Sequence, residues 1–140
     1  MDDVDLLIRE HAALRLLAAE IEKTIGPQRE VGWDDRSDFK SAALQSASGR
    51  FHLELKAHEA KEDRVIARRS RGRDAGLEEL GSAIDKAHAS LDEMDRLLSV
   101  MAGLYDGTHA HAVRTVAAEL RRELEAHLEY EENVLFPLLR

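Results

Sequence analysis

Apolar residues recur at alternating spacings of three and four through nearly the whole chain, and this pattern constrains the fold more than any other feature. It predicts four helices, over residues 2–25, 37–69, 75–105 and 108–138, separated by stretches that contain glycine or proline. No segment sustains the alternation of apolar and polar residues that marks a half-buried strand. The 140 residues fit one domain, 1–140, so we predict an all-α, antiparallel up-down four-helix bundle.

Each predicted helix also places polar residues within its apolar, inward-facing seam. Every seam contains one histidine, and the second and fourth seams each add one glutamate. The cost of an unpaired carboxylate in an apolar core is several kcal/mol, so we expect these side chains to pair with one another or to bind metal. In chain order, the four seams are Leu7, His11, Leu14, Ala18, Ile21 and Ile25; Leu44, Ala47, Phe51, Leu55, His58, Glu62 and Val65; Leu77, Ile84, His88, Leu91, Asp95 and Leu98; and Val113, Val116, Leu120, Leu124, His127, Glu131, Val134 and Leu138.

The two halves of the chain resemble each other around these polar residues. Residues 11–14 (HAAL) correspond to 88–91 (HASL), and the HxxxE motif at 58–62 recurs at 127–131. Residues four apart lie on one helix face, so each histidine and its glutamate can bind the same ion or adjacent ions. Facing helices of a bundle hold paired iron or manganese with such side chains in other proteins. We therefore predict a shared metal centre with two histidines and one glutamate from each half.

This arrangement resembles the haemerythrin-like, or HHE cation-binding, domain family, from His11 through the closing HLEYEENVLFP at 127–137. The resemblance implies a non-haem centre of two iron ions, although the same ligand types accept manganese or zinc. It also implies that two glutamates bridge the ions and that four histidines are terminal ligands. The bridging residues would be Glu62 and Glu131, and the terminal ligands His11, His58, His88 and His127.

Three departures from the family pattern bear on the site. Oxygen carriers have a second histidine on the third helix where this chain has Asp92, so reversible oxygen carriage is not implied. The run HExxE at 58–62 resembles instead the iron-sensing domain of a ubiquitin-ligase subunit, which implies Glu59 as a further ligand. Carriers place their last acid five residues after the histidine, which selects Glu132, whereas the seam favours Glu131.

Three functions remain open at this point. The favoured one is a protein that binds or senses dioxygen, or another small diatomic ligand, or that handles iron or nitric oxide. The second is a di-iron enzyme acting on peroxide, nitric oxide or ferrous iron. The third is a metal-free helical interaction module that docks through Trp33 or through the basic run at 64–73. We expect no output domain beside the bundle, in which case signalling would require a homo-oligomer or a separate protein partner.

Composition excludes several other classes. The formal net charge of −8 argues against a nucleic-acid partner, and no apolar run approaches the roughly 20 residues that span a bilayer. The absence of cysteine excludes disulfides and thiolate metal sites. With no secretory signal visible, we expect a cytoplasmic protein. Of the remaining histidines, His52 is expected to lie on the surface or to contact a metal ligand from behind, and His109 and His111 are expected at solvated positions far from the site.

Overall fold

Four long helices make up most of the chain. The computed structural model describes residues 2–25, 37–70, 76–104 and 110–139. The helices are α1 (Asp3–Ile25), α2 (Ser37–Ser70), α3 (Gly76–Leu104) and α4 (Ala110–Tyr130), and α4 continues into a π-helical turn, η1 (Glu131–Leu135), and a last short helix, α5 (Phe136–Leu139). The predicted helix ends agree with these bounds to within two residues for the first three helices and for the start of the fourth. Trp33, Arg71, Arg73, His109 and the side chain of Leu77 lie outside the described residues.

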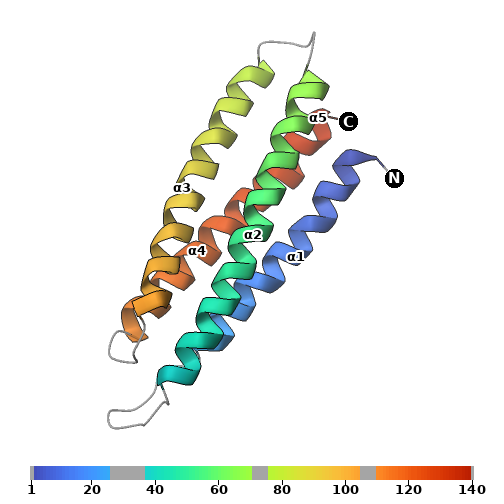
Figure 1. The fold of residues 1–140 in the computed structure, drawn as a ribbon. Helices are drawn as coiled ribbons and strands as arrows, with labels where there is room; N and C mark the ends of the chain where they lie inside the picture. The colour runs from blue at the N-terminus through green and yellow to red at the C-terminus, as the bar shows by residue number, and fades with distance from the viewer. Residues whose placement is uncertain (1, 26–36, 71–75, 105–109, 140) are drawn as a thin grey trace.

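The helices run up and down in turn and form a four-sided bundle (Figure 1). Helix α1 packs against α2 and α4, and α3 packs against the same two helices from the other side. The described residues contain no strand, which confirms the predicted all-α bundle. None of the described helices is apolar over a length sufficient to cross a membrane.

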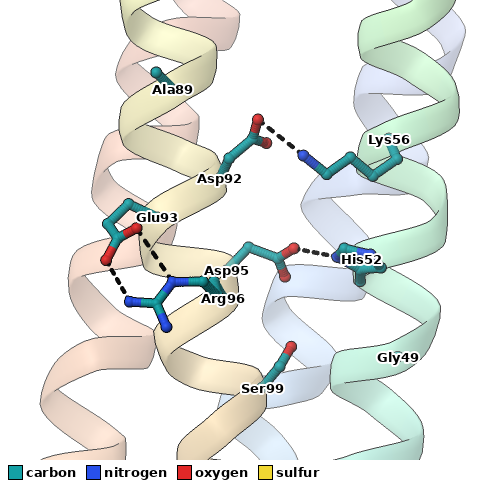
Figure 2. Close-up of a pocket in the computed structure, with 9 residues that line it drawn as sticks. All are labelled: Gly49, His52, Lys56, Ala89, Asp92, Glu93, Asp95, Arg96 and Ser99. Atoms are coloured by element: carbon teal, nitrogen blue, oxygen red, sulfur yellow. Dashed lines mark hydrogen bonds and ion pairs between the residues drawn. The ribbon is translucent and has the colours of Figure 1, made fainter.

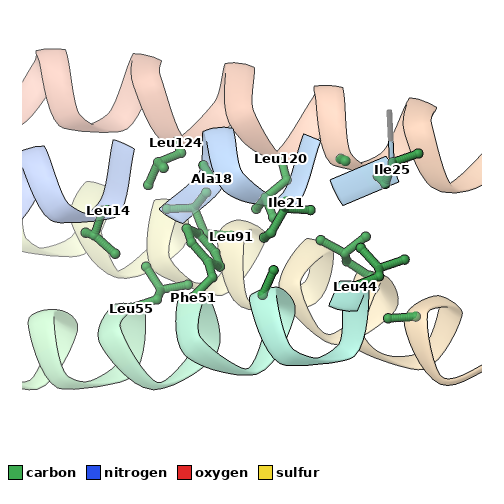
Figure 3. Packing of buried hydrophobic residues seen from close by; sticks show 14 of the residues in the cluster. Leu14, Ala18, Ile21, Ile25, Leu44, Phe51, Leu55, Leu91, Leu120 and Leu124 are labelled. Atoms are coloured by element: carbon green, nitrogen blue, oxygen red, sulfur yellow. The ribbon is translucent and has the colours of Figure 1, made fainter. Parts of the chain in front are cut away.

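The inward seams predicted from the sequence form the core. Two apolar clusters fill the bundle. The larger cluster, part of which is drawn in Figure 3, includes Leu14, Phe51, Leu91 and Leu124, one from each helix. Burial of a side chain of this size contributes about 1.5–3 kcal/mol, so the cluster is the main source of stability for the bundle. The smaller cluster occupies the end of the bundle where both termini lie (Figure 1), and it consists of Val4, Leu7, Val65, Ile84, Leu135, Phe136 and Leu139.

The fourth seam differs from the prediction after Glu131. Val134 and Leu138 were expected to be buried, but they are 40% and 48% exposed, and Leu135 and Leu139 are buried in their place. The cause is the π-helical turn, in which the backbone N–H of Phe136 bonds to the carbonyl of Glu131, five residues earlier. The wider turn accommodates one extra residue, and every later inward position therefore moves by one.

One further seam position was wrong for a simpler reason. Val116 is only partly buried, and Ala117 takes the inward place on that turn of α4. Either residue satisfies a spacing of three or four after Val113. Both residues also connect to Leu120 by a step of three or four, so the spacing alone does not choose between them, and the structure turns the smaller side chain, Ala117, toward the core.

Candidate metal centre

The polar seam residues form one layer across the bundle, between the two apolar clusters. On every helix, the side chains on either side of this layer belong to different clusters. Leu7, Val65, Ile84 and Leu135 belong to the smaller cluster, whereas Leu14, Leu55, Leu91 and Leu128 belong to the larger one. The layer is therefore closed to water above and below, and its polar atoms must find their partners within it.

Two groups of ligand-type atoms converge in this layer. The first consists of His11, His58, Glu62 and Glu131, and the second consists of Glu62, His88, His127 and Glu131; within each group the ligand atoms lie within 4.8 Å of one another. All six residues are buried. The structure therefore brings together six of the seven predicted ligands, and it places the two glutamates in both groups.

Each glutamate divides its two oxygens between the two groups. Glu62 Oε2 lies 3.2 Å from His58 Nε2, and its Oε1 lies 3.0 Å from His88 Nε2. Glu131 Oε1 lies 3.1 Å from His11 Nε2, and its Oε2 lies 3.0 Å from His127 Nε2. A carboxylate that bridges two ions must present one oxygen to each, and both glutamates have this arrangement. Each group also contains one pair of imidazoles, and the two pairs are alike: the ring centroids are 4.9 Å apart for His11 and His58 and 5.0 Å apart for His88 and His127.

Many of these atoms lack a hydrogen bond despite their proximity. The buried atoms without a hydrogen-bond partner include the Nε2 atoms of three of the histidines, Glu62 Oε2 and both carboxylate oxygens of Glu131. Two ligands held about 2.1 Å from one ion at a right angle lie about 3 Å apart, with their lone pairs aimed at the ion rather than at each other. Three of the four contacts, at 3.0–3.2 Å, lack hydrogen-bond alignment and fit such a donor set. The fourth, between His88 Nε2 and Glu62 Oε1 at 3.0 Å, is a hydrogen bond.

A metal-free network of histidine–glutamate ion pairs accounts for the layer less well. Burial lowers the pKa of both His11 and His127 to about 4, so these imidazoles are neutral at neutral pH and cannot compensate a carboxylate charge. Against the cost of burial, hydrogen bonding to the Glu62 carboxylate raises the pKa of His58 and of His88, so these two imidazoles can compensate Glu62. Neutral imidazole is also the form that binds metal. Burial and the neighbouring Glu62 carboxylate raise the pKa of Glu131, which shows that the layer without a cation does not accommodate both negative charges.

The opposite ring nitrogens of two histidines contact carboxylates at the rim of the layer. His11 Nδ1 lies 3.2 Å from Glu132 Oε2, and His58 Nδ1 lies 2.9 Å from Glu10 Oε1. Glu132 thus contacts the far side of an imidazole and belongs to neither group, so Glu131 occupies the central place, as the seam favoured. Sequence reasoning missed Glu10 because it lies off the seam and resembles an ordinary surface acid.

The structure places Glu59 outside both groups. Its side chain is buried, Lys56 Nζ lies 3.7 Å from its Oε1, and burial together with Asp92 raises the pKa of its carboxyl to about 7. The implied role of Glu59 as a ligand stays a prediction. Asp92 is half-buried, and its Oδ2 lies 2.8 Å from Lys56 Nζ.

The other polar residues noted in the sequence lie away from the buried polar layer. Asp95 is buried, and its Oδ2 lies 2.5 Å from Nδ1 of the half-exposed His52. Figure 2 shows this pair spanning a surface pocket between α2 and α3, beside the pair formed by Lys56 and Asp92. His111 is exposed on α4.

Comparison with known proteins agrees with this geometry. A family model described as the hemerythrin HHE cation binding domain matches residues 2–139. Comparisons with curated proteins and with solved structures give no significant match. The matched segment contains all four helices and every residue of the buried polar layer. The chain therefore belongs to the hemerythrin HHE cation-binding domain family.

Proposed function

We propose that this chain holds two iron ions in the buried layer and uses them to bind or sense dioxygen or another small diatomic ligand, or to handle iron or nitric oxide. The observation that carries the proposal is the sharing of Glu62 and Glu131 between two groups, with one oxygen of each directed to either side. Imidazole and carboxylate ligands suit iron, and the family match supports a cation. We propose the cytoplasm as its compartment.

The protein would supply three things: imidazole ligands, two negatively charged glutamates shared between the ions, and an apolar surround that excludes water. His11 and His58 would hold one ion, His88 and His127 the other, and the two glutamates would keep the ions together and offset their charge. A ferrous pair, when bound, supplies reducing electrons and a coordination position open to a small ligand. Leucines of the larger cluster, including Leu14, Leu55 and Leu91, pack beside the layer and keep bulk water away from that position.

An enzyme on the same centre is the second candidate. Six residues converge here, two of them carboxylates, and Asp92 stands where oxygen carriers have a fifth histidine. A centre with relatively few histidines is suited to turnover rather than to reversible binding. Consumption of peroxide or nitric oxide over many cycles by the iron-loaded protein, or continuous oxidation of added ferrous iron, would favour this candidate over simple binding.

The first experiment measures metal content and the visible spectrum of protein purified without added metal, before and after air reaches the reduced form. We expect about two irons per chain and a near-ultraviolet band that depends on oxygen. The His111→Ala variant, which alters an exposed residue, serves as the control and should behave like the wild type. Protein that contains no metal, and takes up none when ferrous iron is supplied, would refute the proposal and favour the metal-free interaction module.

A further inference from the structure

The four central imidazoles differ in the contacts of Nδ1, the ring nitrogen that points away from the central glutamates. His11 and His58 each contact a carboxylate through Nδ1, at 3.2 Å and 2.9 Å respectively. In each case the other nitrogen, Nε2, faces a central glutamate. An imidazole in this arrangement donates its Nδ1–H to the outer carboxylate and presents a fixed lone pair on Nε2 to an ion.

The two outer carboxylates are in turn held by cations. Arg15 Nη2 lies 2.9 Å from Glu132 Oε2, and Arg15 Nε also bonds to Glu125 at 3.0 Å, so the guanidinium is anchored on both sides. The ammonium group of Lys61 contacts Glu10. These contacts keep both carboxylates ionised and in place, since a hydrogen bond from a cation to a carboxylate is among the stronger polar contacts in proteins.

Within the described part of the chain, no carboxylate lies within hydrogen-bond distance of Nδ1 of His88 or of His127. The acid nearest to His88 Nδ1 is Asp63, at 3.9 Å, which is too far for a hydrogen bond, and its side chain is 59% exposed. For His127, the one carboxylate within 4.0 Å among the described residues is Glu131, which faces Nε2. Glu59 belongs to neither group: its Oε1 lies 3.7 Å from Lys56 Nζ, and its buried Oε2 has no hydrogen-bond partner, so it does not bond to either imidazole.

From this contrast we infer that the two metal positions are unequal: the His11–His58 position binds its ion first and more tightly, and the His88–His127 position is the exchangeable one. The inference rests on the proposed metal centre. The two glutamates do not discriminate between the positions, because each offers one oxygen to either side. The difference comes from Glu10 and Glu132, which act as positioning residues. A carboxylate behind a metal-bound imidazole typically contributes 10–100-fold in metal affinity.

The test titrates the metal-free protein with Co²⁺ in the absence of air. The visible absorption of Co²⁺ changes when protein ligands replace water around the ion, so each binding step can be followed. We expect two resolved steps in the wild type. Glu10→Ala and Glu132→Ala should each weaken the first step by about 10–100-fold and change the second step little. Asp63→Ala is the matched control, and it should leave both steps unchanged. Melting temperatures of the metal-free variants would show that each still folds.

Removal of one imidazole identifies which position corresponds to which step. His127→Ala should retain one Co²⁺ at about the first-step affinity, whereas His11→Ala should retain one only at the weaker affinity. A single step with equal affinities, or a His11→Ala variant that binds as tightly as His127→Ala, would overturn the inequality while leaving the metal centre intact. No Co²⁺ binding at all would overturn the metal centre, and the inference with it.

Discussion

Glu62 on α2 and Glu131 at the start of η1 are the two residues common to both groups of ligand-type atoms, and both are 0% exposed. Each directs one carboxylate oxygen to an imidazole of the His11–His58 position and the other to an imidazole of the His88–His127 position. Neither glutamate has a lysine or arginine within 4.0 Å among the described residues. A cation bound between them is therefore the simplest source of charge compensation.

The variants Glu62→Ala and Glu131→Ala should each lose bound metal and the stability that the metal contributes. The metal-free forms should behave differently, because removal of Glu131 also removes a buried carboxylate that has no lysine or arginine within 4.0 Å among the described residues. We expect metal-free Glu131→Ala to be at least as stable as the metal-free wild type. Metal analysis of the purified variants measures the loss of metal, and urea unfolding with and without chelator compares the stabilities of the metal-free and metal-bound forms. Retention of wild-type metal content by both variants would contradict the assignment of the bridging residues.

Chelation of the metal should lower the melting temperature of the wild-type protein. An ion present at 100 times its dissociation constant stabilises the folded state by about 2.7 kcal/mol. For a chain of this size, that corresponds to a decrease on the order of 10 °C. Calorimetry before and after chelation, followed by restoration with ferrous iron under anaerobic conditions, measures the effect. An unchanged melting temperature is the result that a metal-free bundle predicts.

The π-helical turn makes a prediction about two neighbouring residues. Leu135 is buried and Val134 is 40% exposed, so Leu135→Ala should destabilise the protein by about 2–5 kcal/mol and Val134→Ala by less than about 1 kcal/mol. Urea unfolding of the two variants makes the comparison. An uninterrupted α-helix would place Val134 inward instead, and a larger loss for Val134→Ala would therefore refute the register described here.

A pH-dependent contribution to stability comes from Asp3, far from the metal centre. The hydrogen bond from Arg69 lowers the pKa of the Asp3 carboxyl, and Arg68 adds to this effect against the opposing cost of burial. The contribution is therefore present above the unfolded pKa of about 3.9 and is lost as the pH falls through the folded value. Asp3→Asn should cost less than about 1 kcal/mol at pH 7.

Unfolding of Asp3→Asn and of the wild type across pH 2–7 provides the measurement. The two stabilities should converge at the acid end of this range, and added salt at pH 7 should reduce the difference because the pair is partly exposed. A difference that persists unchanged at low pH would show that the ion pair is not its cause.

Much of the fold could be predicted from local information. The spacing of Leu7, Leu14 and Ile21 on α1, and the equivalent spacings on the other helices, specify which face of each helix is buried. Up-down connection of four such helices predicts that at least three of the four histidines reach one level of the bundle, because each residue along a helix adds a constant rise. All six central residues are buried, as their places in the seams predicted.

Other features depend on contacts between distant parts of the chain. The seam pattern assumed an unbroken α-helix, and it therefore could not anticipate the extra residue in η1 or the inward rotation of Leu135 and Leu139. Glu10 and Arg15 lie outside the apolar seam of α1 and give no periodic signal. Their partners, His58 on α2 and Glu132 on η1, become neighbours only when the helices pack.

The sequence by itself determined the helical class, the buried faces and five of the six converging side chains, the four histidines and Glu62, because each follows from the period of one helix and the cost of burying a polar group. Only the tertiary structure decided that Glu131 rather than Glu132 lies at the centre, and that carboxylates lie behind the imidazoles of His11 and His58. These properties depend on the rotation of one helix against another, and a periodicity of residues within a single helix contains no information about that rotation.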